Sequence, residues 1–277
     1  MGVVTALSLF GFFDERPAHQ YLVSHSSGST SKPAVRAQYD AARRLIGSAS
    51  TPRAGKPELV SDEPDLRAIE EEMRTWPNFQ AFEAYFGPSS CSIACVEIAP
   101  LLVAQIHVLA DAARKPLEST GLAALVARCL RSEVNHGPAD IQGGPGRLTI
   151  THPDLNVRAG PAGGWSEHNG AVLVGALLSG SPPWVQVMNL GGRFILRNGY
   201  HRAVQLGLAG VTHIPAVVIT TDDATKLEVA GFPDAVLRQQ APPTIGHFIR
   251  GQATELDVYE IERVVEIRWT ESQRRKR

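Results

Sequence analysis

A histidine and an arginine, His201 and Arg202, follow a glycine at the point where an apolar strand pattern gives way to a helical one. Residues 194–197 favour a strand, and Gly199 favours a turn because glycine tolerates a positive φ. A helix that begins at Tyr200 presents unpaired N–H groups and the positive end of its dipole, which attract anions. An arginine adds a bidentate donor for phosphate, and a histidine adds a titratable donor. The pattern therefore predicts a phosphate or nucleotide site.

Short elements on both sides of this turn must position it. Residues 185–189 and 193–197 alternate like strands, and Gly191-Gly192 between them supplies the positive φ that a hairpin turn needs. A helix over 200–209 and a strand over 214–219 complete the unit. The sequence thus predicts a hairpin, a helix and a strand around the candidate site.

The same segment resembles a known superfamily. The run Asn198-Gly199-Tyr200-His201-Arg202, with Leu206-Gly207 and Ile214-Pro215 downstream, resembles the core of the ParB/sulfiredoxin-like superfamily. The resemblance covers about 146–222 and implies a ParB N-terminal-like nucleotide-binding domain with a mixed sheet. It implies that the histidine–arginine pair contacts nucleotide phosphates. Together with the strand–glycine–helix pattern, it predicts the following phosphate or nucleotide contacts: Arg197, Asn198, Gly199, Tyr200, His201 and Arg202.

Three departures limit what the resemblance implies about chemistry. Tyr200 stands where sulfiredoxins carry a catalytic cysteine, which argues against repair of cysteine sulfinic acid. Asn198 stands where the related free-serine kinases carry an aspartate, and asparagine cannot act as a base. ParB proteins usually show an arginine-rich version of the turn, and here His201 replaces one arginine.

A glycine-rich loop over 160–169 is the second candidate site. In the superfamily the corresponding loop helps to line the nucleotide site, which implies nucleotide contacts for Glu167 and His168. His168 could act there as an acid or a base. The alternative is a solvent-exposed loop whose glycines serve only its turns.

The expected function is nucleotide binding. The sequence does not decide whether the protein also catalyses a reaction on the nucleotide. If the protein is an enzyme, it is an NTPase or a phosphotransferase in which His201 and Arg202 are the catalytic residues. The ligand is ATP, ADP or CTP, and Mg²⁺ is expected with phosphoryl chemistry. Asp222 and Asp223 are the only nearby acidic candidates for the metal. The alternative function is a non-enzymatic DNA-associated ParB-like module or an interaction scaffold.

Composition narrows the class of protein. The 277 residues carry 27 basic and 28 acidic side chains, so no global field attracts DNA or an anionic membrane. The three cysteines, Cys91, Cys95 and Cys129, form no metal-type spacing and suit a reducing cytoplasm. No segment reads as a signal peptide or a membrane span. The sequence carries no signal for an oligomeric state.

The whole chain reads as an α/β (α+β) protein in three parts. A mainly helical N-terminal region over 1–140 precedes the ParB/sulfiredoxin-like mixed-sheet domain over 146–222, and an extension with a basic tail covers 223–277. We expect strands over 21–25, 147–151 and 156–158. We expect helices over 36–46, 65–74, 78–86, 100–114, 118–131 and 171–178. For residues 258–269, the sequence pattern fits either a strand or a helix.

Overall fold

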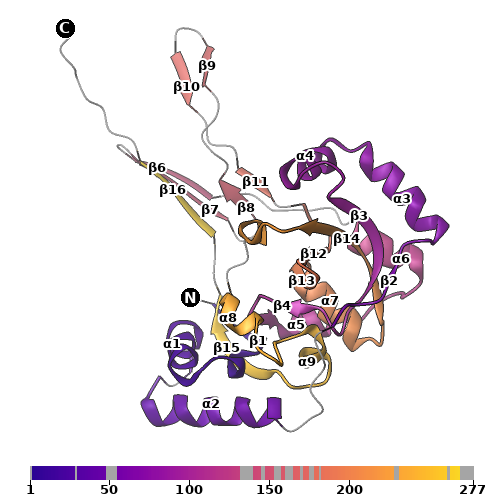
Figure 1. Ribbon diagram of the computed structural model, residues 1–277. Helices are drawn as coiled ribbons and strands as arrows, with labels where there is room; N and C mark the ends of the chain where they lie inside the picture. Colours follow the sequence, from indigo (N-terminus) through magenta and orange to yellow (C-terminus); the bar gives the residue numbers. More distant parts are fainter. Residues whose placement is uncertain are drawn as a thin grey trace. The chain divides into compact units, whose positions relative to one another are not determined.

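The computed structural model describes residues 2–28, 30–47, 55–131, 140–144, 147–152, 157–159, 165–168, 171–174, 178–180, 182–227, 231–260 and 263–268. The chain forms two compact units, each described here by itself. The first unit combines residues 1–132 with 183–259, and the second combines 133–182 with 260–277. Figure 1 shows both units and labels most of their helices and strands.

A six-stranded mixed sheet forms the centre of the first unit. Its strand order is β2-β3-β14-β12-β13-β4. The strands are β2 (Leu59–Val60), β3 (Cys91–Glu97), β4 (Leu102–Val103), β12 (Gln186–Leu190), β13 (Arg193–Asn198) and β14 (His213–Thr221). β12 and β14 run parallel, with Leu190 beside Thr221, whereas β12 and β13 form an antiparallel hairpin.

A second sheet of three strands lies in the same unit. Its order is β15-β1-β5, and both pairings are antiparallel. The strands are β1 (Val3–Ser8), β5 (His107–Leu109) and β15 (Thr254–Tyr259). The short 3-10 helix η1 (Phe10–Phe12) and the helices α1 (Glu15–His25) and α2 (Lys32–Gly47) follow β1 and lie beside this sheet (Figure 1).

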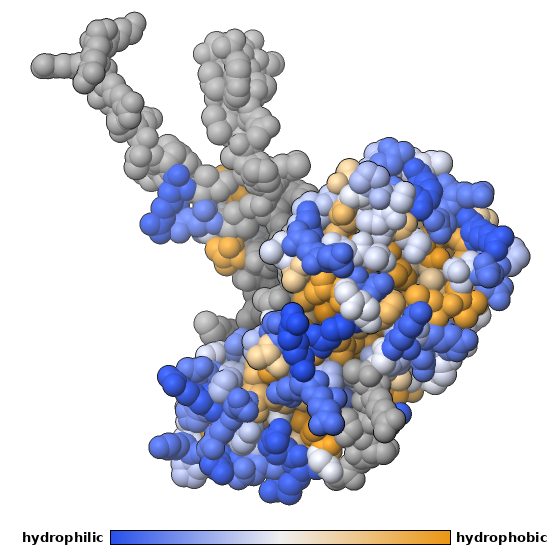
Figure 2. Space-filling model, viewed as in Figure 1, coloured by the Kyte–Doolittle hydropathy of each residue, from blue (hydrophilic) through white to orange (hydrophobic). Residues whose placement is uncertain are grey.

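Seven helices and one further 3-10 turn complete the described part of the first unit. They are α3 (Pro64–Arg74), α4 (Pro77–Phe86), α5 (Ala110–Arg114), α6 (Leu122–Cys129), α7 (Tyr200–Leu208), η2 (Ala224–Leu227), α8 (Asp234–Leu237) and α9 (Ile245–Ile249). α3 packs on β3, α6 packs on β14, and α7 packs against α5 and α9. Figure 2 shows hydrophilic side chains over the outer faces of α1, α2 and α3.

Apolar spacing explains how these helices dock. In α3 the buried residues are Leu66, Ile69 and Met73, which lie three and four positions apart on one face. In α4 the rings of Phe79 and Phe82 each lie 5.4 Å from the ring of Trp184. These contacts join α4 to the segment that leads into β12.

The described residues of the second unit form strands. β6 (Asp140–Gly144), β7 (Arg147–His152) and β16 (Arg263–Arg268) make an antiparallel sheet in the order β16-β7-β6. β8 (Val157–Ala159) pairs with β11 (Leu178–Gly180), and β9 (Trp165–His168) pairs with β10 (Ala171–Val174). None of the helices in the described part of either unit has the length and apolar character that crossing a bilayer requires.

The predicted α/β class and the elements around the candidate turn are confirmed. The hairpin β12–β13, the helix α7 and the strand β14 lie where the sequence predicts them. Gly191 and Gly192 both have a positive φ, 58° and 83°. The helices α2, α3, α4 and α6 and the strands β7 and β8 also match predicted segments.

Three local predictions are wrong. Residues 21–25 end the helix α1 instead of forming a strand, because Ala18, Tyr21 and Leu22 share its buried face. Residues 100–114 form β4, β5 and the five-residue α5 instead of one helix, because β4 and β5 pair with strands distant in sequence. Residues 171–174 form β10 instead of the start of a helix, because they pair with β9.

The compact units divide the chain differently from the predicted parts. The region 1–140 supplies β1 to β5 as well as helices, so it is not mainly helical after residue 90. β3 and β4 belong to the same sheet as β12, β13 and β14, which joins the region 1–132 to 183–259. The predicted boundary near 140 lies close to the division between residues 132 and 133, whereas no division between the units lies near 222.

A buried histidine gives the first unit a testable dependence on pH. His247 is 0% exposed, and its Nδ1 accepts the N–H of Thr244 at 3.0 Å. Burial is the main cause that lowers its pKa to about 4, and Arg250 adds to the effect. At pH values below the ordinary histidine pKa of about 6.5, His247 becomes protonated in the unfolded chain but stays neutral in the folded chain. Folding stability must therefore fall as the pH drops from that value toward about 4.

We predict that His247→Asn flattens this dependence, because asparagine keeps an acceptor for Thr244 and does not titrate. The free energy of unfolding, measured by urea denaturation between about pH 4.5 and 6, should change less steeply than in the wild type. The difference should be at most about 1.4 kcal/mol per pH unit. Identical slopes in the two proteins would show that His247 is not kept neutral by the fold.

Candidate functional site

The turn before α7 is shaped by close packing. Gly199 has φ 92°, in the left-handed region, and a Cβ at this position would lie 2.9 Å from Cγ2 of Val185. The residue must therefore be glycine for two independent reasons. The predicted glycine turn is present, and its bare backbone faces Val185 at the start of β12.

Tyr200 fills the core. Its side chain is 4% exposed, and its hydroxyl donates to the carbonyl of Leu196 and accepts the N–H of Ala104. Burial raises its pKa above its ordinary value. The side chain predicted to contact a nucleotide therefore lies in the protein interior.

His201 lies half-buried in the first turn of α7. Its Nε2 accepts the backbone N–H of Leu109 at 2.9 Å, which places the proton of the neutral ring on Nδ1. Burial, and then the charge of Arg202, lower its pKa. His201 is therefore a neutral donor at Nδ1, and its acceptor nitrogen is already occupied. Its catalytic role stays a prediction. For that role, the hydrogen bond from the N–H of Leu109 to Nε2 would have to break.

Arg202 holds two chain segments together. Its Nη1 donates to the carbonyl of Arg128 at 3.0 Å, and its Nη2 donates to the carbonyl of Pro183. Arg128 lies in the last turn of α6, and Pro183 is the first residue of the first unit after the segment 133–182. A cation at a helix C-terminus also complements the helix dipole. The guanidinium group predicted to bind phosphate thus uses two of its nitrogens to donate hydrogen bonds to backbone carbonyls.

A second arginine, which the sequence reasoning missed, lies beside Arg202. Arg128 donates through Nη2 to the side-chain oxygen of Gln205 in α7, and its Nε is buried without a partner in the described part of the chain. Neither Arg128 nor Arg202 has an ion pair with a carboxylate among the described residues. Burial and the neighbouring Arg128 lower the pKa of Arg202. The site therefore carries excess positive charge.

Two further residues of the predicted site belong to the sheet. Arg197 donates to the carbonyl of Lys226 and to the side chain of Gln186, and its guanidinium lies 5.3 Å from the ring centre of Phe86. The side-chain oxygen of Asn198 accepts the N–H of Gly199 at 2.8 Å and so fixes the turn. Both residues support the turn through protein contacts.

The second predicted site falls in the second unit. Glu167 and His168 lie in β9, where their backbones pair with Val172 and Ala171. Residues 160–164 and 169 of the predicted loop lie outside the described residues. The prediction that this loop lines the same site as His201 stays a prediction.

The acidic residues considered for a metal lie at the other end of the sheet from the turn. Asp222 follows β14 at the level of the β12–β13 turn, because Thr221 pairs with Leu190 and Leu190 pairs with Arg193. β13 separates that level from Gly199 by roughly 17 Å. The hydroxyl and N–H of Thr225 lower the pKa of Asp223. Among the described residues, no group of three or more metal-binding side chains is close enough to hold an ion.

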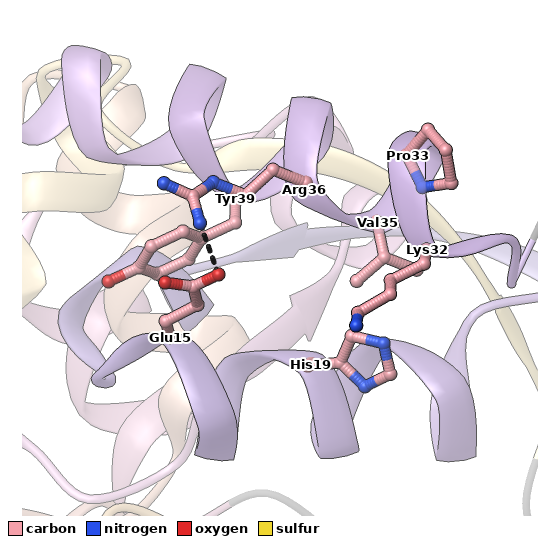
Figure 3. A pocket seen from close by; sticks show the side chains of 7 residues that line it. All are labelled: Glu15, His19, Lys32, Pro33, Val35, Arg36 and Tyr39. Atoms are coloured by element: carbon pink, nitrogen blue, oxygen red, sulfur yellow. Dashed lines mark hydrogen bonds and ion pairs between the residues drawn. The ribbon is translucent and has the colours of Figure 1, made fainter.

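Two cavities stand out in the described part of the first unit. One of about 310 Å³ lies between α1 and α2, where Glu15 and Arg36 form an exposed ion pair (Figure 3). The other, of about 790 Å³, includes Asp222 and lies beside the β12–β13 turn. Neither cavity is lined by a residue of the predicted turn.

The three cysteines have free thiols. Burial raises the pKa of Cys91 and of Cys129 to about 11 and raises that of Cys95 as well. Cys129 is 0% exposed, and the charges of Arg202 and Arg128 oppose the effect of its burial. At neutral pH all three are protonated thiols and weak nucleophiles.

No protein family, curated protein or solved structure matches this chain.

The fit of Gly199 against Val185 predicts a steep cost of substitution. Gly199→Ala should lower the free energy of unfolding by about 2–4 kcal/mol, because it adds a steric clash to the strain of a positive φ. Gly192→Ala is the matched control, since φ is also positive there and nothing lies within 4 Å of an added Cβ. The control should cost only about 1 kcal/mol in the same urea titration. Equal costs for the two variants would contradict the packing role of Gly199.

Proposed function

We propose that the protein binds a phosphate-bearing ligand of the nucleotide class at the first turn of α7, beside Arg128 and Arg202. One observation carries the proposal: two adjacent, half-buried guanidinium groups have no carboxylate partner in the described part of the chain. The ligand phosphate would supply the missing negative charge.

Charge balance supports this assignment. Partly buried charges are normally paired, because removing an ion from water costs free energy that hydrogen bonds to neutral groups only partly offset. Among the described residues, Arg128 and Arg202 donate only to carbonyl and amide oxygens, so a net positive charge remains. Burial, and to a smaller extent the charge of Arg128, lower the pKa of Arg202, so both disfavour its charged form. A bound anion would balance the positive charge.

The available donors suit a phosphate. Nε of Arg128 is buried and unpartnered among the described residues, and Nδ1 of His201 carries a proton while Nε2 is occupied. The N-terminus of the nine-residue helix α7 adds the positive end of a dipole. Arg202, fixed by two carbonyls, would contribute charge at a set position, and Arg128 would contribute direct hydrogen bonds.

The resemblance of the turn to the ParB/sulfiredoxin-like superfamily supports a nucleotide as the source of the phosphate, with ATP, ADP and CTP as the first candidates. The proposed setting is the cytoplasm, where thiols stay reduced. The proposal concerns binding. Hydrolysis or phosphoryl transfer would need a proton acceptor, and Nε2 of His201 is engaged by Leu109.

We predict that Arg128→Gln weakens nucleotide binding without destabilising the protein. Loss of a charge-assisted contact should raise Kd by about tenfold or more. The melting temperature without nucleotide should stay unchanged or rise, because the substitution removes the repulsion between two like charges. Titration calorimetry with ATP, ADP, CTP and GTP, with and without Mg²⁺, and differential scanning calorimetry measure the two effects.

Arg131→Gln is the matched control at the same end of α6. Arg131 forms an exposed ion pair with Glu72, so its loss should cost less than about 1 kcal/mol and leave Kd unchanged. The proposal fails if the wild type binds none of the nucleotides, or if Arg128→Gln lowers the melting temperature and leaves Kd as it was. Binding of duplex DNA in place of nucleotides would favour the DNA-associated alternative.

A further inference from the structure

The cavity of about 790 Å³ lies at the end of the main sheet away from α7. Its lining comes from the β12–β13 turn, from η2 and from α8 with the residues before it. The parallel strands β12 and β14 both end there, at Leu190 and Thr221. In open α/β sheets, ligands commonly bind just beyond the carboxyl ends of parallel strands.

The floor of this cavity is apolar and firmly held. Ile195, Phe232 and Leu237 line it and are 2%, 5% and 3% exposed. The N–H of Phe232 donates to the carbonyl of Ala104 at 2.7 Å. The contact requires glycine at position 231, because a Cβ there would lie 1.9 Å from the same oxygen. The floor is therefore preformed, which lowers the entropic cost of binding a ligand.

The rim carries two opposite charges that have no partner in the described part of the chain. Arg193 and Asp222 both line the cavity, and neither side chain has a hydrogen bond or ion pair among the described residues. The other two charged residues of the rim, Asp234 and Arg238, form an ion pair with each other. The cavity thus offers one free cation and one free anion, within the described part of the chain, above an apolar floor.

The register of the sheet sets the distance between these two charges. Arg193 pairs with Leu190, and Leu190 pairs with Thr221, which precedes Asp222. Two strand spacings therefore separate the backbones that carry them, roughly 10 Å. Three extended residues of a peptide span about the same distance.

We propose that this cavity binds a short peptide of about three residues with apolar side chains and free termini. Arg193 would bind the terminal carboxylate, Asp222 would bind the terminal ammonium group, and the apolar floor would receive the side chains between them. A cavity of about 790 Å³ lies within the size range of small-molecule sites. The site is separate from the α7 turn, so the proposal does not depend on nucleotide binding.

Titration calorimetry with trileucine and its two blocked forms tests the proposal on the full-length protein. The wild type should bind trileucine, and both N-acetyl-trileucine and trileucine amide should bind about tenfold more weakly, since each loses one charge-assisted contact. Asp222→Asn should bind the free and the acetylated peptide equally. Arg193→Gln should bind the free and the amidated peptide equally.

The double variant Asp234→Asn, Arg238→Gln is the control, because it removes charge from the same rim without touching the free pair. It should discriminate between free and blocked peptides as the wild type does. Circular dichroism should show that all variants are folded, since these side chains lie on the surface. The proposal is overturned if trileucine does not bind at millimolar concentration, if the wild type binds the blocked peptides as tightly as the free one, or if the two single variants keep the full discrimination.

Discussion

The first unit depends on one guanidinium group that closes the chain around a long insertion. Arg202 binds the carbonyls of Arg128 and Pro183, which lie on the two sides of the segment 133–182. The N–H of Val185 donates to the carbonyl of Cys129 at 2.8 Å and reinforces the same closure. Without these contacts, the end of α6 and the start of β12 would have to be held together by apolar packing alone.

The other residues of the turn extend this closure to the rest of the unit. His201 fixes the end of β5 through Leu109, and Tyr200 connects β13 to the segment after β4 through Leu196 and Ala104. Gly199 allows β13 and α7 to approach Val185. The turn that the sequence predicts as a phosphate site thus connects several distant segments of the first unit through its side chains.

The proposed ligand site follows from the same connections. Bringing Arg202 to the end of α6 also brings it beside Arg128, and both charges then lie half-buried without a carboxylate among the described residues. Such an arrangement is unfavourable by itself and becomes favourable when an anion binds. Strain and unpaired charge of this kind are typical of functional sites, where a ligand supplies the compensating interaction.

Local sequence signals predicted the elements whose structure is decided locally. Gly191-Gly192 marked the hairpin and Gly199 marked the start of α7, and a helix was predicted over 65–74, where α3 lies. The segment 100–114 could not be predicted in this way, because β4 and β5 exist only through pairing with β13 and β1. For the same reason Arg128 was missed: it is seventy-four positions from Arg202, and only the packing of α6 against β14 and the contacts to α7 bring the two together.

The most direct test of the account is the position of a phosphate analogue in a crystal of the protein. Tungstate is a tetrahedral dianion that anomalous diffraction locates without ambiguity. The account predicts a tungstate within hydrogen-bonding distance of Nε of Arg128, next to Arg202 and the first turn of α7, with both backbone contacts of Arg202 kept. Tungstate bound only elsewhere, or a carboxylate of the protein in contact with Arg128, would contradict it.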